Sequence, residues 1–381
     1  MAGIYIHIPF CQTFCIYCSF YSERGAGAVA PYFRALRAEA VARKGFFAPQ
    51  VSPETLYIGG GTPSLVPVPE LARMVPLLQE LFGVAAWREF TLEANPDDVT
   101  LQKAEEWASI GVNRVSLGVQ SFCDDSLRWM RRRHSARQAA EAFHTLRRAG
   151  FTNISLDLIF GYATLSDELW RADVETLLEL RPEHISCYQM GIEEGSALWD
   201  MVRDGLYREP SDERCSGQYA MLQEMAAGAG YHQYEISNFA LPGYEALHNG
   251  SYWRGGPYLG LGPGAHSFDG DRIRSWNAPD LEGYLKRWGG AGAPPEPLPE
   301  GEAKGWERLS DTDIYNETVM LSLRTTAGLD LGKLNPRLLE KGISAIEKGV
   351  EAGVLERSGS VVRIPSGRFF QSDAIMASLF L

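Results

Sequence analysis

Three cysteines near the start of the chain have a spacing that suits metal chemistry. Cys11, Cys15 and Cys18 form a Cys-x3-Cys-x2-Cys triplet. Thiolates are soft ligands that bind zinc, copper(I) or the iron of iron–sulfur clusters. Three thiolates can ligate three irons of a [4Fe–4S] cluster and leave the fourth iron open to a ligand from outside the chain. The triplet therefore indicates a reactive iron–sulfur centre.

A structural zinc site is the alternative for the same triplet. Such a site needs four protein ligands, and the sequence offers no second pair of Cys or His at a suitable distance. His7, four residues before Cys11, or a distant residue would have to complete it. The other three cysteines stand alone, and we expect each of them to be a buried small hydrophobic residue: Cys123, Cys187 and Cys215.

Length and charge limit the possible classes of protein. The chain has 381 residues, of which 45% are hydrophobic, enough for one large barrel and a smaller domain. It carries 36 basic and 48 acidic residues, a net charge of −12, which argues against a nucleic-acid partner. No apolar run is long enough to span a membrane, and the N-terminus lacks the features of a signal peptide. We expect a globular cytoplasmic protein without a transmembrane segment.

Strand-like segments alternate with helical patterns through the first two thirds of the chain. Amphipathic helices are expected at 31–45, 70–83 and 136–150. This alternation predicts an α/β fold, an incomplete (β/α)6-type TIM-like barrel with working residues at the carboxyl ends of its strands. The expected strands cover residues 3–10, 55–60, 89–95, 114–120, 153–161 and 184–190.

The pattern changes after a helix expected near 211–229. A strand is expected at 231–240, and a segment rich in Gly, Pro and Glu indicates a linker. A helix at 310–324 and a hairpin over 354–367 predict a small C-terminal α+β domain that resembles a winged helix. The expected division is barrel 1–230, extension 231–290, linker 291–306 and C-terminal domain 307–381.

Polar residues occur where several predicted strands end. The glycines of GGGTPS (59–64) allow the backbone to approach a ligand closely. Glu93, Gln120 and Asp157 close predicted strands, and Arg132 lies in a short basic run. Buried charges need partners, so these residues either contact a ligand or form internal ion pairs and caps.

The cysteine triplet with Tyr17 before its last cysteine resembles the signature of the radical SAM superfamily. In that superfamily, the amino and carboxylate groups of S-adenosylmethionine (SAM) chelate the open iron, and an electron from the cluster cleaves the sulfonium to give a 5′-deoxyadenosyl radical. YIHIPFC, GGGTP, LEANP, GVQSF and DLIFG resemble more specifically the oxygen-independent coproporphyrinogen III oxidase (HemN) family, from Tyr5 to about His266. Two departures are FGYA after Asp157, which lacks the expected proline, and Arg131 in place of a small residue. The resemblance implies a SAM site lined by Tyr5, Tyr17, Gly60, Gly61, Thr62, Glu93, Gln120, Arg132 and Asp157.

Two features resemble the haem chaperone branch of this family, HemW, more than the oxidases. Phe20 stands where the oxidases carry a fourth cysteine, and only four residues precede Tyr5, where the oxidases have an extension. The motif H-N-x-x-Y-W is associated with haem in that branch, because imidazole or phenolate can ligate haem iron and aromatic rings can stack on the macrocycle. Alternatively, its residues order a loop and fill the core; His266 is a second candidate ligand. The motif comprises His248, Asn249, Tyr252 and Trp253.

The resemblance therefore implies a haem chaperone with a [4Fe–4S] cluster, SAM and haem. Its partner would be an acceptor haemoprotein, with a flavodoxin- or ferredoxin-like electron donor if radical chemistry occurs. Whether SAM is cleaved, and so whether the protein is an enzyme, stays open. The alternatives are an oxygen-independent coproporphyrinogen III oxidase and another radical SAM enzyme; an RNA-modifying enzyme would need a basic groove, which the acidic composition disfavours.

Overall fold

Six neighbouring parallel strands form the centre of a twelve-stranded sheet in the computed structural model, which describes residues 1–24, 27–290 and 305–381. The strand order is β14-β13-β12-β11-β1-β4-β5-β6-β7-β8-β10-β9, and its two edges are not hydrogen-bonded to each other. The predicted α/β class and incomplete barrel are confirmed. The six strands are β1 (Ala2–Ile8), β4 (Pro53–Gly60), β5 (Glu89–Ala94), β6 (Arg114–Gln120), β7 (Ile154–Phe160) and β8 (His184–Gln189).

The first strand is shorter than predicted because Pro9 interrupts it. Proline has no N–H to donate to the sheet, so β1 ends at Ile8. The chain continues as the two-residue strand β2 (Phe10–Cys11), which pairs with β3 (Glu23–Arg24) apart from the large sheet. The first cysteine therefore lies immediately beyond the carboxyl end of β1.

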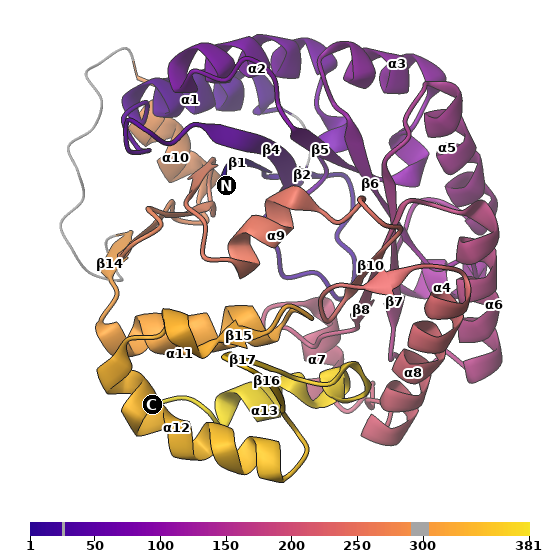
Figure 1. Ribbon diagram of the computed structural model, residues 1–381. Coiled ribbons are helices and arrows are strands. Elements are labelled where there is room, and N and C mark those ends of the chain that lie inside the picture. Colours follow the sequence, from indigo (N-terminus) through magenta and orange to yellow (C-terminus); the bar gives the residue numbers. More distant parts are fainter. Residues whose placement is uncertain (25–26, 291–304) are drawn as a thin grey trace.

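Helices cover the outer side of these strands, as Figure 1 shows for the arc from α1 to α6. The predicted helices at 31–45, 70–83 and 136–150 are confirmed as α1, α2 and α5. Hydroxyl side chains cap several of them, and Ser135 forms a capping box with Gln138 at the start of α5. The arc comprises α1 (Val29–Ala42), α2 (Val68–Phe82), α3 (Leu101–Ser109), α4 (Asp124–Trp129), α5 (Ala136–Arg148) and α6 (Asp167–Leu180), with short 3-10 helices η1 (Pro63–Leu65) and η2 (Pro96–Asp98).

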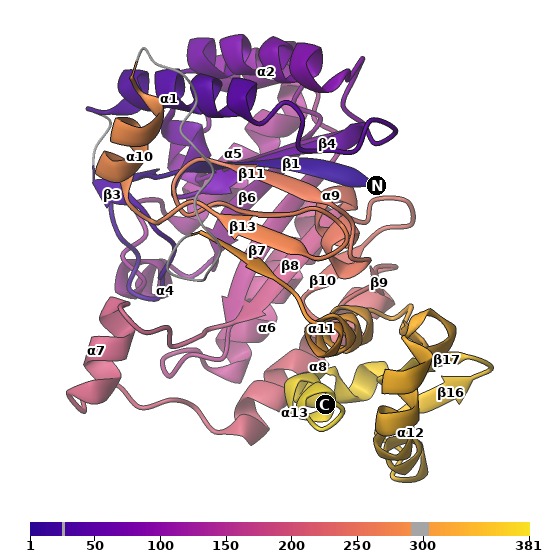
Figure 2. The same cartoon turned by 90° about the vertical axis from the view of Figure 1, so that its left-hand side faces the viewer.

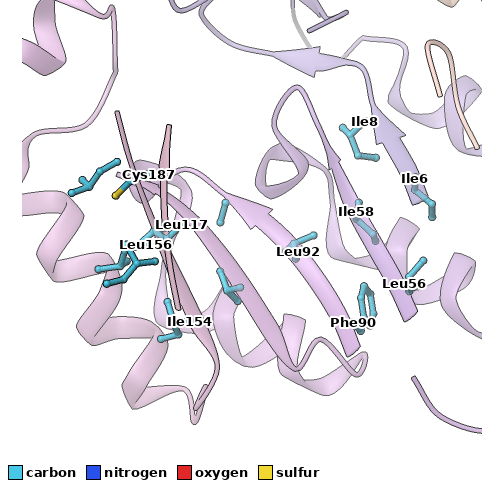
Figure 3. Packing of buried hydrophobic residues seen from close by; sticks show 14 of the residues in the cluster. Ile6, Ile8, Leu56, Ile58, Phe90, Leu92, Leu117, Ile154, Leu156 and Cys187 are labelled. Atoms are coloured by element: carbon cyan, nitrogen blue, oxygen red, sulfur yellow. The ribbon is translucent and has the colours of Figure 1, made fainter. Parts of the chain in front are cut away.

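Side chains alternate between the two faces of the parallel strands. The outward side chains are apolar and buried against the helices, as seen for Ile6, Ile58 and Leu92 in Figure 3. Residues between them in sequence, such as Tyr57 and Glu93, are polar. The outer face therefore supplies the hydrophobic core, and the inner face carries the groups that can do chemistry.

Two of the three isolated cysteines are buried, as the sequence predicted. These two are Cys187 and Cys215. The expectation was wrong for Cys123, which is half-buried, because it occupies the N-cap position of α4 at the molecular surface.

Short strands extend the sheet at both edges. The single strand expected at 231–240 is wrong: β9 and β10 are separated by a turn in which the Glu235 carboxylate accepts the Ser237 N–H at 2.8 Å. At the other edge β11 runs parallel to β1, and the next three strands are antiparallel. These strands are β9 (His232–Gln233), β10 (Asn238–Ala240), β11 (Tyr258–Leu261), β12 (His266–Phe268), β13 (Ile273–Trp276) and β14 (Trp306–Arg308); the nearby helices are α7 (Ala197–Arg203), α8 (Asp212–Gly228), α9 (Leu247–Trp253) and α10 (Leu281–Trp288).

The C-terminal segment gathers beside α8 and α9 (Figure 2). Its predicted first helix and its hairpin are confirmed, and Arg274 of β13 forms a two-pronged ion pair with Glu317 of α11 at 2.6 and 2.9 Å. Most of the expected linker, residues 291–304, lies outside the described residues, so the domain boundaries stay a prediction. The elements are α11 (Asp311–Leu323), β15 (Leu329–Asp330), η4 (Leu331–Lys333), α12 (Pro336–Glu351), β16 (Glu356–Ser358), β17 (Val361–Arg363), η5 (Ser366–Gln371) and α13 (Ser372–Ala377).

None of the helices in the described ranges has both the length and the apolar character that crossing a bilayer requires.

Truncation of a side chain on the outer face should cost far more stability than truncation at the surface. Leu92 is 0% exposed and Leu206 is 75% exposed. We expect Leu92→Ala to lower the free energy of unfolding by about 2–5 kcal/mol and Leu206→Ala to change it by less than about 0.5 kcal/mol. Denaturant titration of both variants measures this; equal effects would contradict the assigned core.

Candidate functional site

A cavity of about 1030 Å³ lies at the carboxyl ends of the parallel strands. Its walls come from the cysteine loop, from the turn after β4, from β5 to β8 and from the segment before α7. Tyr5 and the four residues of the H-N-x-x-Y-W motif do not line it. Eleven of the residues expected from the sequence do: Cys11, Cys15, Tyr17, Cys18, Gly60, Gly61, Thr62, Glu93, Gln120, Arg132 and Asp157.

The three thiols of the triplet are half-buried at the edge of this cavity. The Cys11 sulfur lies 3.4 Å from the Thr62 hydroxyl oxygen, and an Arg132 N–H donates to the Cys15 sulfur at 3.3 Å. Burial raises the pKa of the Cys18 thiol to about 11, so this thiol is protonated near neutral pH in the absence of a metal. Coordination to a metal removes that proton.

The geometry disfavours the zinc alternative. Within the described part of the chain, no three His, Cys, Asp or Glu side chains lie close enough together to hold a single metal ion. His7 is buried, and both ring nitrogens have partners: Nδ1 lies 3.0 Å from the Tyr5 hydroxyl and Nε2 lies 2.8 Å from the Tyr21 carbonyl oxygen. A cluster places each thiolate on a different iron, so three thiols that face one cavity without converging fit it better.

The turn after β4 needs glycine because the chain passes close to the cysteine loop. Gly60 has φ +105°, in the left-handed region that favours glycine. A Cβ on Gly61 would lie 2.7 Å from the Phe10 carbonyl oxygen and 3.1 Å from the Cys11 sulfur. The Gly61 N–H also donates to the Ile8 carbonyl at 2.8 Å. The turn and the cysteine loop therefore fix each other's position.

Glu93 presents a half-buried carboxylate to the cavity from the end of β5. Its Oε1 accepts from the Tyr57 hydroxyl at 2.7 Å, and its Oε2 accepts from the Gly60 N–H at 3.2 Å. Burial raises the pKa of Glu93 to about 7. The carboxyl can therefore gain or lose a proton near neutral pH, and a cationic ligand beside it would favour the charged form.

Asp157 and Arg132 are held by neutral polar partners on neighbouring strands. Asp157 accepts from the hydroxyls of Ser116 at 2.9 Å and Ser155 at 3.0 Å, and burial raises its pKa. Arg132 donates to the Asn95 side-chain oxygen at 2.6 Å and to the Gly118 carbonyl at 2.8 Å, while its buried Nε has no partner. The Asp157 carboxylate and the Arg132 guanidinium thus lie on separate walls of one cavity. This arrangement can bind a ligand that carries both charges.

Some residues of this region were missed by the sequence reasoning. Asn95 and Ser116 line the cavity, and the Tyr57 hydroxyl donates a hydrogen bond to Glu93. Counting by two along each strand from a suspected site residue would have found Asn95 from Glu93, because alternate residues share a face. No local pattern indicates that Tyr57 bonds to Glu93, since the contact joins two strands.

The H-N-x-x-Y-W motif lies on α9, inside the arc of strands (Figure 1), and none of its four residues lines the cavity. His248 is 1% exposed; its Nδ1 lies 2.8 Å from the Thr55 hydroxyl and its Nε2 lies 2.7 Å from the Tyr252 hydroxyl. Trp253 packs under the Arg324 guanidinium at 4.9 Å. His248 is therefore a buried, hydrogen-bonded residue, and the aromatic rings of Tyr252 and Trp253 are half-buried and packed.

Tyr252 and His266, the other candidate haem ligands, also have contacts within the protein. Burial raises the pKa of the Tyr252 phenol far above neutrality, so it is protonated there. Asn249 is half-buried on the same helix. His266, on β12, is exposed, and its ring stacks on that of Trp276 at a centroid distance of 5.7 Å.

Comparisons with known proteins agree with this arrangement. Residues 5–177 match the family model of the radical SAM superfamily. The heme chaperone HemW of Mycobacterium tuberculosis is 34% identical over 99% of this chain and 94% of its own length. The chain belongs to the HemW family. HemW of Bacillus subtilis is 32% identical over 95% of this chain and 94% of its own length.

A solved structure shows the same fold. Coproporphyrinogen III oxidase (HemN) from Escherichia coli, described as a radical SAM enzyme, superposes with a TM-score of 0.80 over all of this chain and 90% of its own. The two sequences are 21% identical, so this likeness concerns the fold of the HemW family member.

A methyl group at Gly61 should disturb the contact between the turn and the cysteine loop. We expect Gly61→Ala to destabilise the fold by about 1–3 kcal/mol, because the new Cβ would meet backbone oxygens that cannot rotate away. Gly217→Ala is the control, since Gly217 lies within α8 with open space around its Cβ position. Denaturant titration compares them; a neutral Gly61→Ala would show that the turn can shift away from the loop.

Proposed function

We propose that this HemW family member is a haem chaperone that binds haem and delivers it to an acceptor haemoprotein. In this proposal Cys11, Cys15 and Cys18 ligate a [4Fe–4S] cluster, and SAM binds in the adjoining cavity. The observation that carries the proposal is the gathering of three thiols and several charged strand ends around one cavity. The 34% identity to a HemW haem chaperone over nearly the whole chain supports it.

The cavity suits SAM in size and charge. Its volume of about 1030 Å³ lies at the upper end of the range for small-molecule sites. Glu93 and Asp157 offer carboxylates to the amino N–H groups and the sulfonium of SAM, and Arg132 offers a cation to its carboxylate. Glycines 60 and 61 let the backbone approach the ligand, and Tyr17 and Gln120 contribute further walls.

A bound cluster would supply an electron for reductive cleavage of SAM, which needs a flavodoxin- or ferredoxin-like donor if it takes place. The residues of this chain would bind and orient SAM for that purpose. Thiols that ligate such a cluster remain reduced in the cytosol, where we propose that the protein works.

Haem ligation by His248 has a definite cost in this fold. Both ring nitrogens have hydrogen-bond partners, so an iron could bind the ring only after Thr55 or Tyr252 is released. We therefore propose that α9 rearranges when haem binds. Its contacts with haem would come from His248, Asn249, Tyr252 and Trp253.

Oxygen-independent coproporphyrinogen III oxidase activity is a second candidate, favoured by the likeness to HemN in fold. Phe20 argues against it, because it takes the position of the fourth cysteine expected in the oxidases. Phe20 is 72% exposed and lines the cavity mouth, so no thiol stands there. Turnover of coproporphyrinogen III by the reconstituted protein would favour the oxidase.

Removal of one thiol of the triplet should prevent assembly of the cluster. After anaerobic reconstitution, we expect Cys11→Ser, Cys15→Ser and Cys18→Ser each to lose the broad visible absorbance, because each would leave one iron without its thiolate. Cys123→Ser is the matched control, a half-buried cysteine outside the cavity. Full absorbance in the triplet variants would rule out the cluster assignment.

Haem should bind stoichiometrically to the protein and less tightly after substitution in the motif. We expect an anaerobic haem titration, followed by difference absorbance, to saturate, with weaker binding in His248→Ala and in Tyr252→Phe. His144→Ala is the control, because His144 is exposed on α5. Weak binding that is equal in all four proteins would remove the main support for the chaperone.

A further inference from the structure

We propose that Tyr57 and His248 are positioning residues that hold the Glu93 carboxylate in the SAM site. Helix α9, which carries the H-N-x-x-Y-W motif, would then help to position Glu93 in the SAM site, independently of whether the motif binds haem. This inference rests on the proposed SAM site and adds two residues that the sequence did not place there.

The start of α9 is fixed to the sheet by a carboxylate. Glu89, the first residue of β5, accepts the backbone N–H groups of Leu247 at 2.8 Å and His248 at 2.9 Å. A negative charge at a helix N-terminus satisfies free N–H groups and the helix dipole. The backbone of His248 is therefore held against the base of the barrel.

The His248 ring is fixed as firmly as its backbone. Thr55 and Tyr252 hold its two nitrogens, and its face stacks on the Tyr57 ring at a centroid distance of 5.1 Å. Thr55 and Tyr57 point to the same side of β4, because they are two residues apart. The His248 ring thus forms one wall of the space in which Tyr57 sits.

Tyr57 connects this wall to the cavity. Its hydroxyl donates to Glu93 Oε1 at 2.7 Å, and the other oxygen, Oε2, accepts the Gly60 N–H. Each carboxylate oxygen therefore has one identified donor, and loss of the Tyr57 hydroxyl would leave Oε1 without its donor. A carboxylate that can rotate is a poorer acceptor for the N–H groups of a ligand's amino group.

The charge on Glu93 depends on the same contact. The groups that face Glu93 are Tyr57 on β4, Tyr5 on β1, Arg114 on β6, Asp157 on β7 and Tyr188 on β8. Burial and Asp157 raise the pKa of Glu93, whereas the Tyr57 hydrogen bond, the Gly60 N–H and Arg114 lower it. Loss of the Tyr57 hydroxyl should raise this pKa further and leave less carboxylate at neutral pH.

Anaerobic SAM titrations on the reconstituted protein test the proposal. We expect Tyr57→Phe to weaken SAM binding by roughly tenfold, as for loss of one hydrogen bond to a charged group, and His248→Ala to weaken it as well. The double variant should bind no more weakly than the weaker single variant, because both substitutions remove one chain of contacts. Tyr284→Phe is the matched control: its buried hydroxyl donates to the buried Glu39 carboxylate at 2.7 Å, outside the cavity, and SAM affinity should not change.

The pH dependence separates positioning from general damage to the fold. SAM affinity should rise with pH as Glu93 loses its proton, with a midpoint near 7 in the unsubstituted protein. In Tyr57→Phe that midpoint should move to higher pH, whereas a merely destabilised protein would keep it. Cluster absorbance and the thermal midpoint, measured on every variant, identify any that is misfolded; Tyr57→Phe preserves the ring and its volume.

Each result of these titrations has a definite meaning. Unchanged affinity and pH midpoint in Tyr57→Phe would overturn the inference while leaving the SAM site in place. Additive losses in the double variant would show that His248 does not act through Tyr57, and would overturn its part. Absence of SAM binding in the unsubstituted protein would overturn both the inference and the proposed SAM site.

Discussion

The polar inner face of the parallel strands is the constraint on which the rest of the structure depends. Alternation along each strand puts Ile6, Ile58 and Leu92 against the helices, and this packing supplies the driving force for folding. The same alternation puts Tyr57 and Glu93 inside the barrel. Buried polar groups are costly without partners, so the interior must provide hydrogen bonds for them.

Helix α9 meets much of this requirement at the base of the barrel. His248 partners Thr55, while Leu247 and His248 give their N–H groups to Glu89. Nearby, His184 lies 2.8 Å from the Ser155 hydroxyl and 2.7 Å from the Tyr234 hydroxyl. At the upper end the strands are left uncovered, and the cavity forms there. The packed amino ends of the strands and the cavity at their carboxyl ends therefore both follow from the polar side chains on the inner face.

The sequence predicted the upper end better than the base. Parallel strands joined by helices must place their carboxyl ends together, so the cysteine loop and the strand-end residues Glu93 and Asp157 could be assigned to one region from their positions alone. The interior position of α9 depends on contacts between residues far apart in the chain, such as Thr55 with His248 and Glu89 with Leu247. No local periodicity records these contacts. For that reason the sequence offered a packing role for the motif as an alternative but could not identify the partners that hold it.

Local errors have equally local causes. Pro9 ends the first strand before the predicted boundary, and the Glu235 carboxylate stabilises a turn within a segment that reads as one strand. Cys123 is half-buried because it begins a helix, which hydrophobicity alone does not reveal.

Only a few residues of β4 connect the His248 ring to the cavity-lining Glu93. From Thr55 to Gly60, strand β4 passes the His248 ring, carries Tyr57 and ends at the turn that bonds Glu93. A ligand that draws His248 away from Thr55 or Tyr252 would remove a wall of the space that holds Tyr57. Because coupling between two sites is reciprocal, a ligand held by Glu93 would in turn favour the packed form of α9. If haem and SAM bind where we propose, release of haem and retention of SAM would favour the same conformation of α9, which would give the cavity a role in haem delivery without cleavage of SAM.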